Sequence, residues 1–156
     1  MIICERSEVI SRAKGLRDIG ENLITVGGCF DLLHVGHVEL LREARKLKGF
    51  VWVIMNTDDS LSRIKPGRPI VTFEERSRLV DAIRYVDFVS PFSEDTPCRI
   101  LSDIKPSIHV KGADYENVPI PESQTVYKYG GKVVFLPLVE GVSTTKIIKK
   151  IRGAQE

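Results

Sequence analysis

The sequence predicts a doubly wound α/β domain, and two patterns along the chain support this fold class. Five short runs of β-branched and other apolar residues recur between residues 23 and 136, and helix-like segments separate most of them. Strands that alternate with helices in this way favour one parallel sheet covered by helices on both faces. We therefore expect a Rossmann-like, five-stranded parallel sheet in a single domain, with strands at 23–26, 51–55, 88–90, 108–110 and 133–136.

The segment before the first strand is expected to form a helix. Apolar residues recur there at helical intervals, namely Val9, Ile10, Ala13, Leu16 and Ile19. We interpret residues 1–22 as a helical extension that precedes a core spanning residues 23–151. This helix is expected to pack on the sheet, and it is also a candidate for a contact between two copies of the chain.

Local signals mark where the later helices begin and end. An amphipathic helix is expected at 38–47, directly after the first strand. Thr72 and Glu75 form a capping-box pattern ahead of a helix at 76–83, and Thr96 followed by Pro97 begins another. The glycine pair at 130–131 ends a helix over 123–129, and Ser143 caps the last helix.

Composition and charge limit the classes of function. The chain has 156 residues, of which 42% are hydrophobic and 28% charged, as expected for one soluble globular domain. Its 23 lysines and arginines nearly balance 21 acidic residues, and this net charge of +2 argues against a nucleic acid or an anionic membrane as partner. The apolar runs have the length of strands, and residues 1–4 are too short for the core of a signal peptide, so we expect a cytoplasmic location.

The three cysteines are Cys4, Cys29 and Cys98. They are widely spaced and form no C-x-x-C pair, which argues against structural disulfides and against a zinc site. We expect no dedicated protein metal site. Cys29 is interpreted as a small buried residue beneath its loop rather than as a nucleophile.

Residues 28–37, with the sequence Gly-Cys-Phe-Asp-Leu-Leu-His-Val-Gly-His, carry the strongest chemical signal. They place His34, Gly36 and His37 where the first strand turns into a helix. Unpaired N–H groups and the helix dipole attract anions there, and Gly36 allows a phosphate or ribose to approach the backbone. Both imidazoles can donate to phosphate oxygens and so stabilise the charge that gathers on an attacked α-phosphorus. An isolated H-x-G-H is equally consistent with histidines that only satisfy backbone groups, so neighbouring motifs must decide.

A second motif opens the last predicted helix, where residues 141–146 read Gly-Val-Ser-Thr-Thr-Lys. Ser143, Thr144 and Thr145 offer hydroxyl and backbone N–H groups to the β- and γ-phosphates of a nucleotide. For Lys146, contact with phosphate and exposure to solvent remain open. With both motifs in this order, the chain resembles the cytidylyltransferase-like nucleotidyltransferases over about residues 23–151.

Within that family the chain is most similar to the adenylyltransferase domain of ADP-heptose synthesis. The similar blocks are Asn56-Thr57-Asp58, Arg68-Pro69, Glu75-Arg76, Glu94-Asp95-Thr96-Pro97 and Val110-Lys111-Gly112-Ala113-Asp114-Tyr115. The resemblance implies that ATP and a heptose 1-phosphate are the substrates and that the protein is a homodimer. Mg²⁺ is expected to arrive with the triphosphate, held largely by phosphates and water.

Glycerol-3-phosphate cytidylyltransferase is a near relative, and the block Ile83-Arg84-Tyr85-Val86-Asp87 is more similar to that enzyme. Two differences favour ATP. Leu138 replaces an arginine that cytidylyltransferases carry three residues before the glycine of the last motif, which removes a fixed cation. Gly112-Ala113-Asp114-Tyr115 also replaces their G-D-D-W block. CTP with a phosphorylated polyol therefore stays as the alternative substrate pair.

The predicted site combines catalytic and nucleotide-binding residues. The catalytic residues are His34, His37 and Lys65. The nucleotide-binding residues are Gly28, Cys29, Phe30, Asp31, Gly36, Arg68, Arg84, Lys111, Gly112, Asp114, Ser143, Thr144 and Thr145.

Several of these residues have more than one reading. Lys65 and Arg68 are expected on a lid over the phosphates, against the alternative of a solvated basic loop. Asp31 is expected to fix its loop by accepting backbone N–H bonds. Lys111 and Asp114 are expected to face the acceptor or the ribose, and Asp114 can instead hold a magnesium-bound water.

Two further residues are outside the predicted site. Arg76 is left open between a phosphate and a carboxylate such as Glu75 or Asp87. His109 alternates with apolar residues on a strand and is interpreted as structural.

These motifs predict an enzyme that transfers a nucleoside monophosphate from a triphosphate, most simply ATP, to a sugar 1-phosphate and releases pyrophosphate. A nucleotide-binding sensor module without catalysis is the non-enzyme alternative, and the presence of both halves of the clamp argues against it. A pyrophosphatase-like hydrolase would need a cluster of carboxylates on one helix, and the sequence has none.

Overall fold

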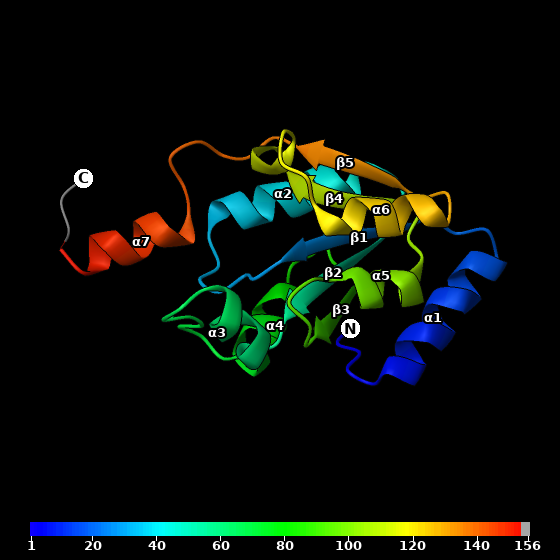
Figure 1. Ribbon diagram of the computed structural model, residues 1–156, viewed down its shortest axis with the longest axis horizontal. Helices are drawn as coiled ribbons and strands as arrows, with labels where there is room; N and C mark the ends of the chain where they lie inside the picture. The colour runs from blue at the N-terminus through cyan, green and yellow to red at the C-terminus, as the bar shows by residue number, and fades with distance from the viewer. Residues whose placement is uncertain (154–156) are drawn as a thin grey trace.

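Residues 1–153 are described in the computed structural model of the chain, which places one five-stranded sheet between two layers of helices (Figure 1). All four strand pairings are parallel, in the order β3-β2-β1-β4-β5. The strands are β1 (Leu23–Gly28), β2 (Phe50–Asn56), β3 (Phe88–Phe92), β4 (Ile108–Gly112) and β5 (Lys132–Leu136). The predicted α/β fold class and its five strands are confirmed.

Helices cover both faces of the sheet. On one face, α1 (Arg6–Asp18), α5 (Cys98–Ile104) and α6 (Pro121–Lys128) contribute buried residues to one apolar cluster. On the other face, α2 (Val35–Arg45) and α4 (Phe73–Asp81) contribute to a second. The expected helix before the first strand is therefore present as α1 and packs on the sheet.

The two clusters follow from the alternation of side chains along each strand. In β2, Trp52 and Ile54 belong to the cluster under α1, while Val51 and Val53 belong to the cluster under α2. All four side chains are buried, as expected for a parallel strand covered on both faces. The indole N–H of Trp52 donates to Ser90 Oγ at 3.0 Å, so its burial leaves no polar group unsatisfied.

The interior of the sheet also contains a buried polar pair. Thr25 on β1 and His109 on β4 are neighbours in the strand register, and Thr25 Oγ1 lies 2.8 Å from His109 Nδ1. Both side chains are fully buried. Burial, followed by the positive charge of Lys111, lowers the pKa of His109 to about 3, so this imidazole is neutral. The structural role that the sequence predicts for His109 agrees with this environment.

The helix boundaries differ from the predicted ones in several places. Helix α4 (Phe73–Asp81) begins three residues before the expected 76–83, and α6 (Pro121–Lys128) begins two residues before the expected 123–129. Helix α2 begins at Val35 rather than at residue 38, because the extended backbone of His34 already serves as its N-cap. The connection after β2 contains an unpredicted short helix, α3 (Asp58–Ile64), whose N-cap residue Thr57 accepts the N–H of Ser60 at 3.3 Å. The predicted capping box of Thr72 and Glu75 is present at the start of α4.

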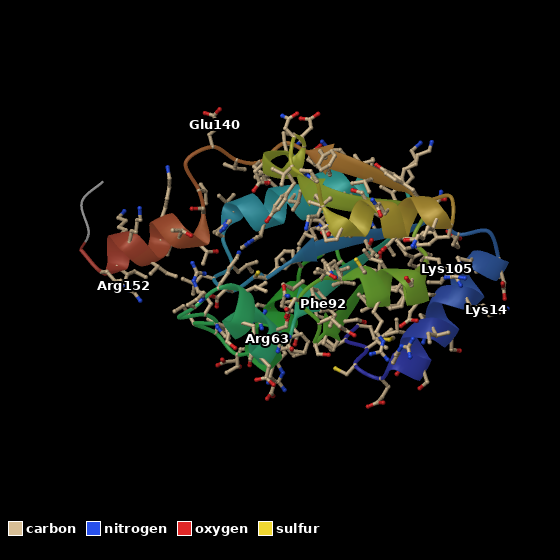
Figure 2. All side chains as sticks on the ribbon, viewed as in Figure 1. Lys14, Arg63, Phe92, Lys105, Glu140 and Arg152 are labelled. Carbon is tan, nitrogen blue, oxygen red and sulfur yellow. The ribbon has the colours of Figure 1, made fainter. Side chains whose placement is uncertain are left out.

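The last helix, α7 (Thr144–Ile151), extends away from the sheet at the end of a long connection (Figure 1). Its predicted N-cap is confirmed, since Ser143 Oγ accepts the N–H of Lys146 at 3.2 Å. Figure 2 shows Glu140 on the connection and Arg152 beyond the helix, both directed into solvent. No residue of α7 is buried, and Ile151 is 75% exposed.

The sheet order determines where a ligand can bind. The chain runs outward from β1 to β2 and β3, then crosses to the other side of β1 for β4 and β5. The strand order therefore reverses between β1 and β4, and in open parallel sheets the ligand crevice lies beyond the carboxyl ends of the strands at that point.

Candidate active site

A cleft of about 650 Å³ lies at the carboxyl ends of the strands. It is lined by segments that follow every strand of the sheet, including the start of α2, the η1 turn (Ala113–Tyr115), the start of α6 and the start of α7. Every residue of the predicted site except Arg84 lines this cleft.

The histidine loop is shaped by the close packing of Gly28 and Phe30. A Cβ on Gly28 would lie 2.8 Å from the Phe30 ring, so only glycine lets the ring lie against the end of β1. Phe30 has a φ of 48°, a left-handed conformation that costs energy for an aromatic residue. Its ring lies 4.9 Å from the ring of His37, measured between centroids, and so supports that imidazole from below.

The two imidazoles are held together at the start of α2. The rings of His34 and His37 stack with centroids 3.8 Å apart and an angle of 16° between their planes. The backbone N–H of His34 donates to His37 Nδ1 at 3.4 Å. Because this nitrogen accepts, the proton of a neutral His37 is on Nε2, which is then a donor.

Both imidazoles are neutral at pH 7. Burial, followed by electrostatic interactions with His34 and Lys65, lowers the pKa of His37 to about 4. Burial also lowers the pKa of His34, whose Nδ1 is buried without a hydrogen-bond partner. The pair therefore offers oriented N–H dipoles beside the unpaired N–H groups of the helix, rather than two positive charges.

Gly36 lies between the two histidines, and its missing side chain is required by the stack. A Cβ at this position would lie 3.0 Å from His34 Nδ1 and 4.0 Å from the carbonyl oxygen of Val142. The second contact also shows that the connection leading to α7 passes next to the start of α2. Thr144 Oγ1 donates to the carbonyl oxygen of Leu32 at 3.5 Å, which joins the two motifs a second time.

The second motif presents its hydroxyl groups to the same cleft. Ser143, Thr144 and Thr145 all line it. Ser143 Oγ accepts a backbone N–H at the helix start, and a hydroxyl that accepts in this way keeps its own proton for donation. The two motifs that the sequence separates widely are therefore neighbours in space.

Asp31 has the structural role that the sequence predicts. Its carboxylate accepts the backbone N–H groups of Ile70 at 2.7 Å and Val71 at 3.0 Å. Arg68 Nη1 donates to the other oxygen at 2.9 Å. Burial opposes the charge of Asp31, but the bonds from Val71, Arg68 and Ile70 together hold its pKa below the ordinary value. The histidine loop is thereby tied to the connection between α3 and α4, and Arg68 lines the cleft as part of an ion pair.

Arg76 is a buried clamp. Of the two alternatives left open by the sequence, pairing with a helix carboxylate is correct, but the partner is Asp58 at the start of α3 rather than Glu75 or Asp87. Its guanidinium donates to the carbonyl oxygens of Cys29 at 2.6 Å, Asn56 at 3.0 Å and Val71 at 2.9 Å. It also donates to Asp58 Oδ1 at 2.7 Å. The side chain is fully buried and does not line the cleft, so it joins the ends of β1 and β2 to α4 instead of binding phosphate.

Lys65 follows α3 and lines the cleft close enough to His37 to influence its pKa. This position agrees with the expected lid cation. The structure does not bring Arg84 to the cleft. Arg84 precedes β3, and the residues before a parallel strand lie at the opposite edge of the sheet from those after it. Its guanidinium lies 5.8 Å from the Tyr85 ring centroid, and we leave it out of the site.

The block after β4 contributes an ion pair to the cleft. Lys111 Nζ lies 2.8 Å from Glu122 Oε1 and 4.6 Å from the ring centroid of Tyr115. The absence of a side chain on Gly112 is required here, since a Cβ would lie 2.5 Å from Asp114 Oδ1 and 2.9 Å from Leu138 Cδ2. Asp114 and Leu138 therefore fold over Gly112 at the mouth of the cleft.

The predicted site omits four further polar residues that line the cleft, namely Asn56, Asp95, Thr96 and Glu122. The first three belong to blocks shared with the family, which assign them no role. In the structure Asn56 Nδ2 donates to Ser60 Oγ at 2.8 Å. Glu122 follows Pro121 in the first turn of α6, where a carboxylate is ordinary for a helix start. No local signal in the sequence indicates its partner.

Residues 1–153 contain no group of three or more histidine, cysteine or acidic side chains arranged to hold a metal ion. None of the helices in this part of the chain has both the length and the apolar character needed to cross a bilayer.

Comparison with known proteins places the chain in a family. The model of the family described as cytidylyltransferase-like matches residues 25–150, which contain both motifs. The chain belongs to the cytidylyltransferase-like family. The predicted family is thereby confirmed.

Curated relatives of this cytidylyltransferase-like chain include two bifunctional proteins named HldE. The protein from Vibrio atlanticus (strain LGP32) is 40% identical over 154 residues, which cover 98% of this chain and 32% of the relative. The protein from Gluconobacter oxydans (strain 621H) is 45% identical over 136 residues, covering 86% of this chain and 28% of the relative. The chain thus spans about a third of the length of these relatives.

Among solved structures, the cytidylyltransferase-like fold is similar to that of the lipopolysaccharide core biosynthesis protein from Thermoplasma volcanium GSS1. The two superpose with a TM-score of 0.63 at 25% identity, over 77% of this chain and 98% of that one.

Proposed function

We propose that the chain transfers an adenylyl group from ATP to a sugar 1-phosphate of the heptose type, forming a nucleotide-sugar and releasing pyrophosphate. The observation that carries this proposal is the neutral, stacked pair of His34 and His37, which faces one cleft together with Ser143, Thr144 and Thr145. The sequence similarity to the HldE proteins, at 40% and 45% identity, supports nucleotidyl transfer as the class of reaction. The substrates remain our proposal.

The proposed reaction is a single displacement at the α-phosphorus. A phosphate oxygen of the acceptor attacks, the bond to the oxygen that bridges the α- and β-phosphorus breaks, and pyrophosphate leaves with that oxygen. Negative charge builds on the other oxygens of the α-phosphate in the transition state, so fixed donors stabilise it without forming a covalent bond.

His34 and His37 are suited to that task because their orientation is set before substrate arrives. His37 is supported by Phe30 on one side and by His34 on the other, and its Nδ1 is already engaged. A preorganised donor costs no reorientation during the reaction. The Ser-Thr-Thr hydroxyls and the N-terminus of α7 would hold the β- and γ-phosphates, and Lys65 would supply positive charge over them.

Mg²⁺ fits the cleft as a companion of the triphosphate rather than as a resident metal. The carboxylate of Asp31 is fully engaged by Arg68, Ile70 and Val71. Asp114 is the remaining aspartate of the predicted site, and it could hold a water of the metal's hydration shell or a ribose hydroxyl. When bound, Mg²⁺ would neutralise phosphate charge.

The environment of Leu138 supports ATP over CTP. Leu138 lines the cleft and folds over Gly112, so an apolar side chain occupies the place where cytidylyltransferases carry an arginine. CTP with a polyol phosphate remains the alternative that the experiment must include.

Release of pyrophosphate from purified protein with Mg²⁺ tests the proposal. ATP and CTP are each paired with heptose 1-phosphate and with glycerol 3-phosphate, and turnover with ATP and the heptose is expected. Turnover only with CTP and glycerol 3-phosphate would reverse the substrate assignment. Nucleotide binding without turnover on any acceptor would favour a sensor module.

We also propose that the protein is a cytoplasmic homodimer. The isoleucines of α7 support self-association, because Ile151 is 75% exposed, Ile147 and Ile148 are half-buried, and no residue of this helix is fully buried. Light scattering of the purified chain is expected to give twice the mass of one chain.

A further inference from the structure

The ion pair of Lys111 and Glu122 divides the cleft into two chemically different ends. Lys111 Nζ donates to Glu122 Oε1 at 2.8 Å, and the side chains are only 14% and 5% exposed. The ammonium group also lies 4.6 Å from the centroid of the Tyr115 ring, which provides a second contact favourable to a cation. Lys111 is therefore fixed from two directions.

This arrangement changes what Lys111 can bind. An unpaired lysine in a cleft attracts phosphate, but a carboxylate at hydrogen-bond distance cancels its charge. Drawing Lys111 away to a phosphate would leave Glu122 buried and unpaired, which is strongly unfavourable. The end of the cleft after β4 therefore has no free lysine charge to offer, whereas the end at His37 has Lys65 and the N-terminus of α2.

The walls around the pair are apolar. Tyr115, Val118 and Ile120 line this end of the cleft, together with Pro119, Pro121 and Leu138. A nucleobase requires apolar surfaces against its faces and a few fixed polar groups near its edge or its ribose. The surroundings of the pair meet both requirements.

We propose that Glu122 is a positioning residue, which holds Lys111 in place and cancels its charge so that this end of the cleft receives the uncharged nucleoside. This assignment rests on the proposed function, since it takes the triphosphate as the ligand. Glu122 acts through Lys111 and has no part in the chemical step.

Binding measurements on variants test the assignment without requiring turnover. The probes are the α,β-methylene analogue of ATP and pyrophosphate, both with Mg²⁺, titrated by calorimetry. Their affinity ratio reports the contribution of the nucleoside. Glu122→Gln is expected to weaken the analogue about tenfold, the usual effect of losing one charge-assisted hydrogen bond, and to leave pyrophosphate binding equal or tighter.

A double-mutant cycle distinguishes positioning from a direct role. In a Lys111→Met background, Glu122→Gln is expected to change the analogue affinity less than twofold, because its target is gone. Glu116→Gln is the matched control, since Glu116 is exposed in the same connection and does not line the cleft. It should behave as the unmodified chain.

Three results would overturn the assignment: equal weakening of both probes by Glu122→Gln, no effect on the analogue, or additive effects in the cycle. If Glu122→Gln does not fold, the double variant Lys111→Met/Glu122→Gln, which leaves no buried charge unpaired, carries the test. A loss of pyrophosphate affinity equal to or greater than the loss of analogue affinity then contradicts the proposal. Pyrophosphate release by the unmodified chain separately tests the proposed function, so the two failures are distinguishable.

Discussion

Asp31 and Arg68 form an ion pair that joins the histidine loop to the connection before α4. Arg68 Nη1 donates to Asp31 Oδ2 at 2.9 Å, and the two side chains are 14% and 1% exposed. Asp31 Oδ1 also accepts the backbone N–H groups of Ile70 and Val71, which lie 39 and 40 residues further along the chain. The position of the histidine loop therefore depends on a segment that is distant in the sequence.

Asp31→Asn is expected to lower the free energy of unfolding by about 2 kcal/mol, because the introduced amide places a donor against the Arg68 guanidinium. Chemical denaturation measures the loss. Asp18→Asn is the control: its ion pair with Lys14 is exposed, so a change of less than about 0.5 kcal/mol is expected. The pKa of Asp31 is lowered in the folded state, so its contribution is present at neutral pH and is lost as the pH falls through that lowered pKa. Equal effects of the two substitutions would contradict the clamp.

Arg76→Met is expected to destabilise the protein by about 3 kcal/mol, since it leaves three carbonyl oxygens and Asp58 without their buried donor. Arg78 on the same helix provides the control, because its side chain is 74% exposed and its ion pair with Glu74 is long, at 3.9 Å. Arg78→Met should change stability by less than about 0.5 kcal/mol. Thermal unfolding of both variants compares them, and a small effect at Arg76 would refute its assignment as a clamp.

The pKa of each of the three histidines is expected to lie below the ordinary value of an imidazole. Burial lowers the pKa of His37 to about 4 and that of His109 to about 3, and it lowers the pKa of His34 as well. NMR titration of the imidazole Cε1–H signals should therefore show no midpoint near 6.5 in the folded protein, whereas the urea-unfolded chain should titrate there. A folded-state midpoint near 6.5 for any of the three would disprove this expectation.

These pKa values also predict a loss of stability in acid. The unfolded chain takes up protons as the pH falls below about 6.5, while the folded histidines do not, so the balance shifts toward unfolding. The free energy of unfolding is expected to fall as the pH is lowered from about 6.5 towards 4, the pKa of His37. Denaturant titrations at several pH values measure this slope, and a constant stability across the window would contradict it.

His37→Ala is expected to reduce kcat for pyrophosphate release by about 10² to 10³, with a much smaller change in KM, because it removes a donor used in the transition state. Thermal unfolding of the variant checks that the fold is retained. Turnover close to that of the unmodified chain would show that the imidazole pair is not catalytic.

Gly36→Ala tests the need for space beneath the imidazole stack. The added Cβ would lie 3.0 Å from His34 Nδ1, so the ring must shift, and kcat is expected to fall about tenfold or more. Gly15→Ala is the matched control on α1, where nothing lies within 4 Å of the added carbon. It should stabilise the helix by about 0.5–1 kcal/mol and leave kcat unchanged. If Gly36→Ala and Gly15→Ala had similar kcat values, the space beside the His34 ring would not be required for catalysis.

The fold was predictable from the sequence because each strand contains an apolar run, and the central strands are buried on both faces. Val51–Met55 illustrates this, since every side chain in it is fully buried. The histidine and Ser-Thr-Thr motifs were equally predictable, because each combines a helix start with residues able to donate to phosphate. The two motifs lie close together where Gly36 approaches the carbonyl oxygen of Val142. This proximity follows from the parallel sheet, in which the carboxyl ends of all strands lie at the same edge.

Side-chain partners distant in the chain were not predictable in the same way. The capping box located the helix that carries Arg76, but nothing local indicates that its guanidinium reaches Cys29 and Asn56. Arg84 was misplaced because its block was judged by similarity rather than by its position before a strand. Glu122 and Lys111 meet only because α6 packs beside β5, the neighbour of β4 in the sheet, which no pattern near either residue specifies.

The separation of the cleft into two ends has an evolutionary consequence. The imidazole pair lies at the start of α2 and is fixed by Phe30 and Gly36. The ion pair and most of its apolar walls lie instead in the connection between β4 and α6 and in the residues at its two ends. Mutations in that connection can change which nucleoside is accepted without disturbing the donors that act on the α-phosphate. New substrate preferences can therefore arise by drift in one surface segment while selection keeps the chemistry constant.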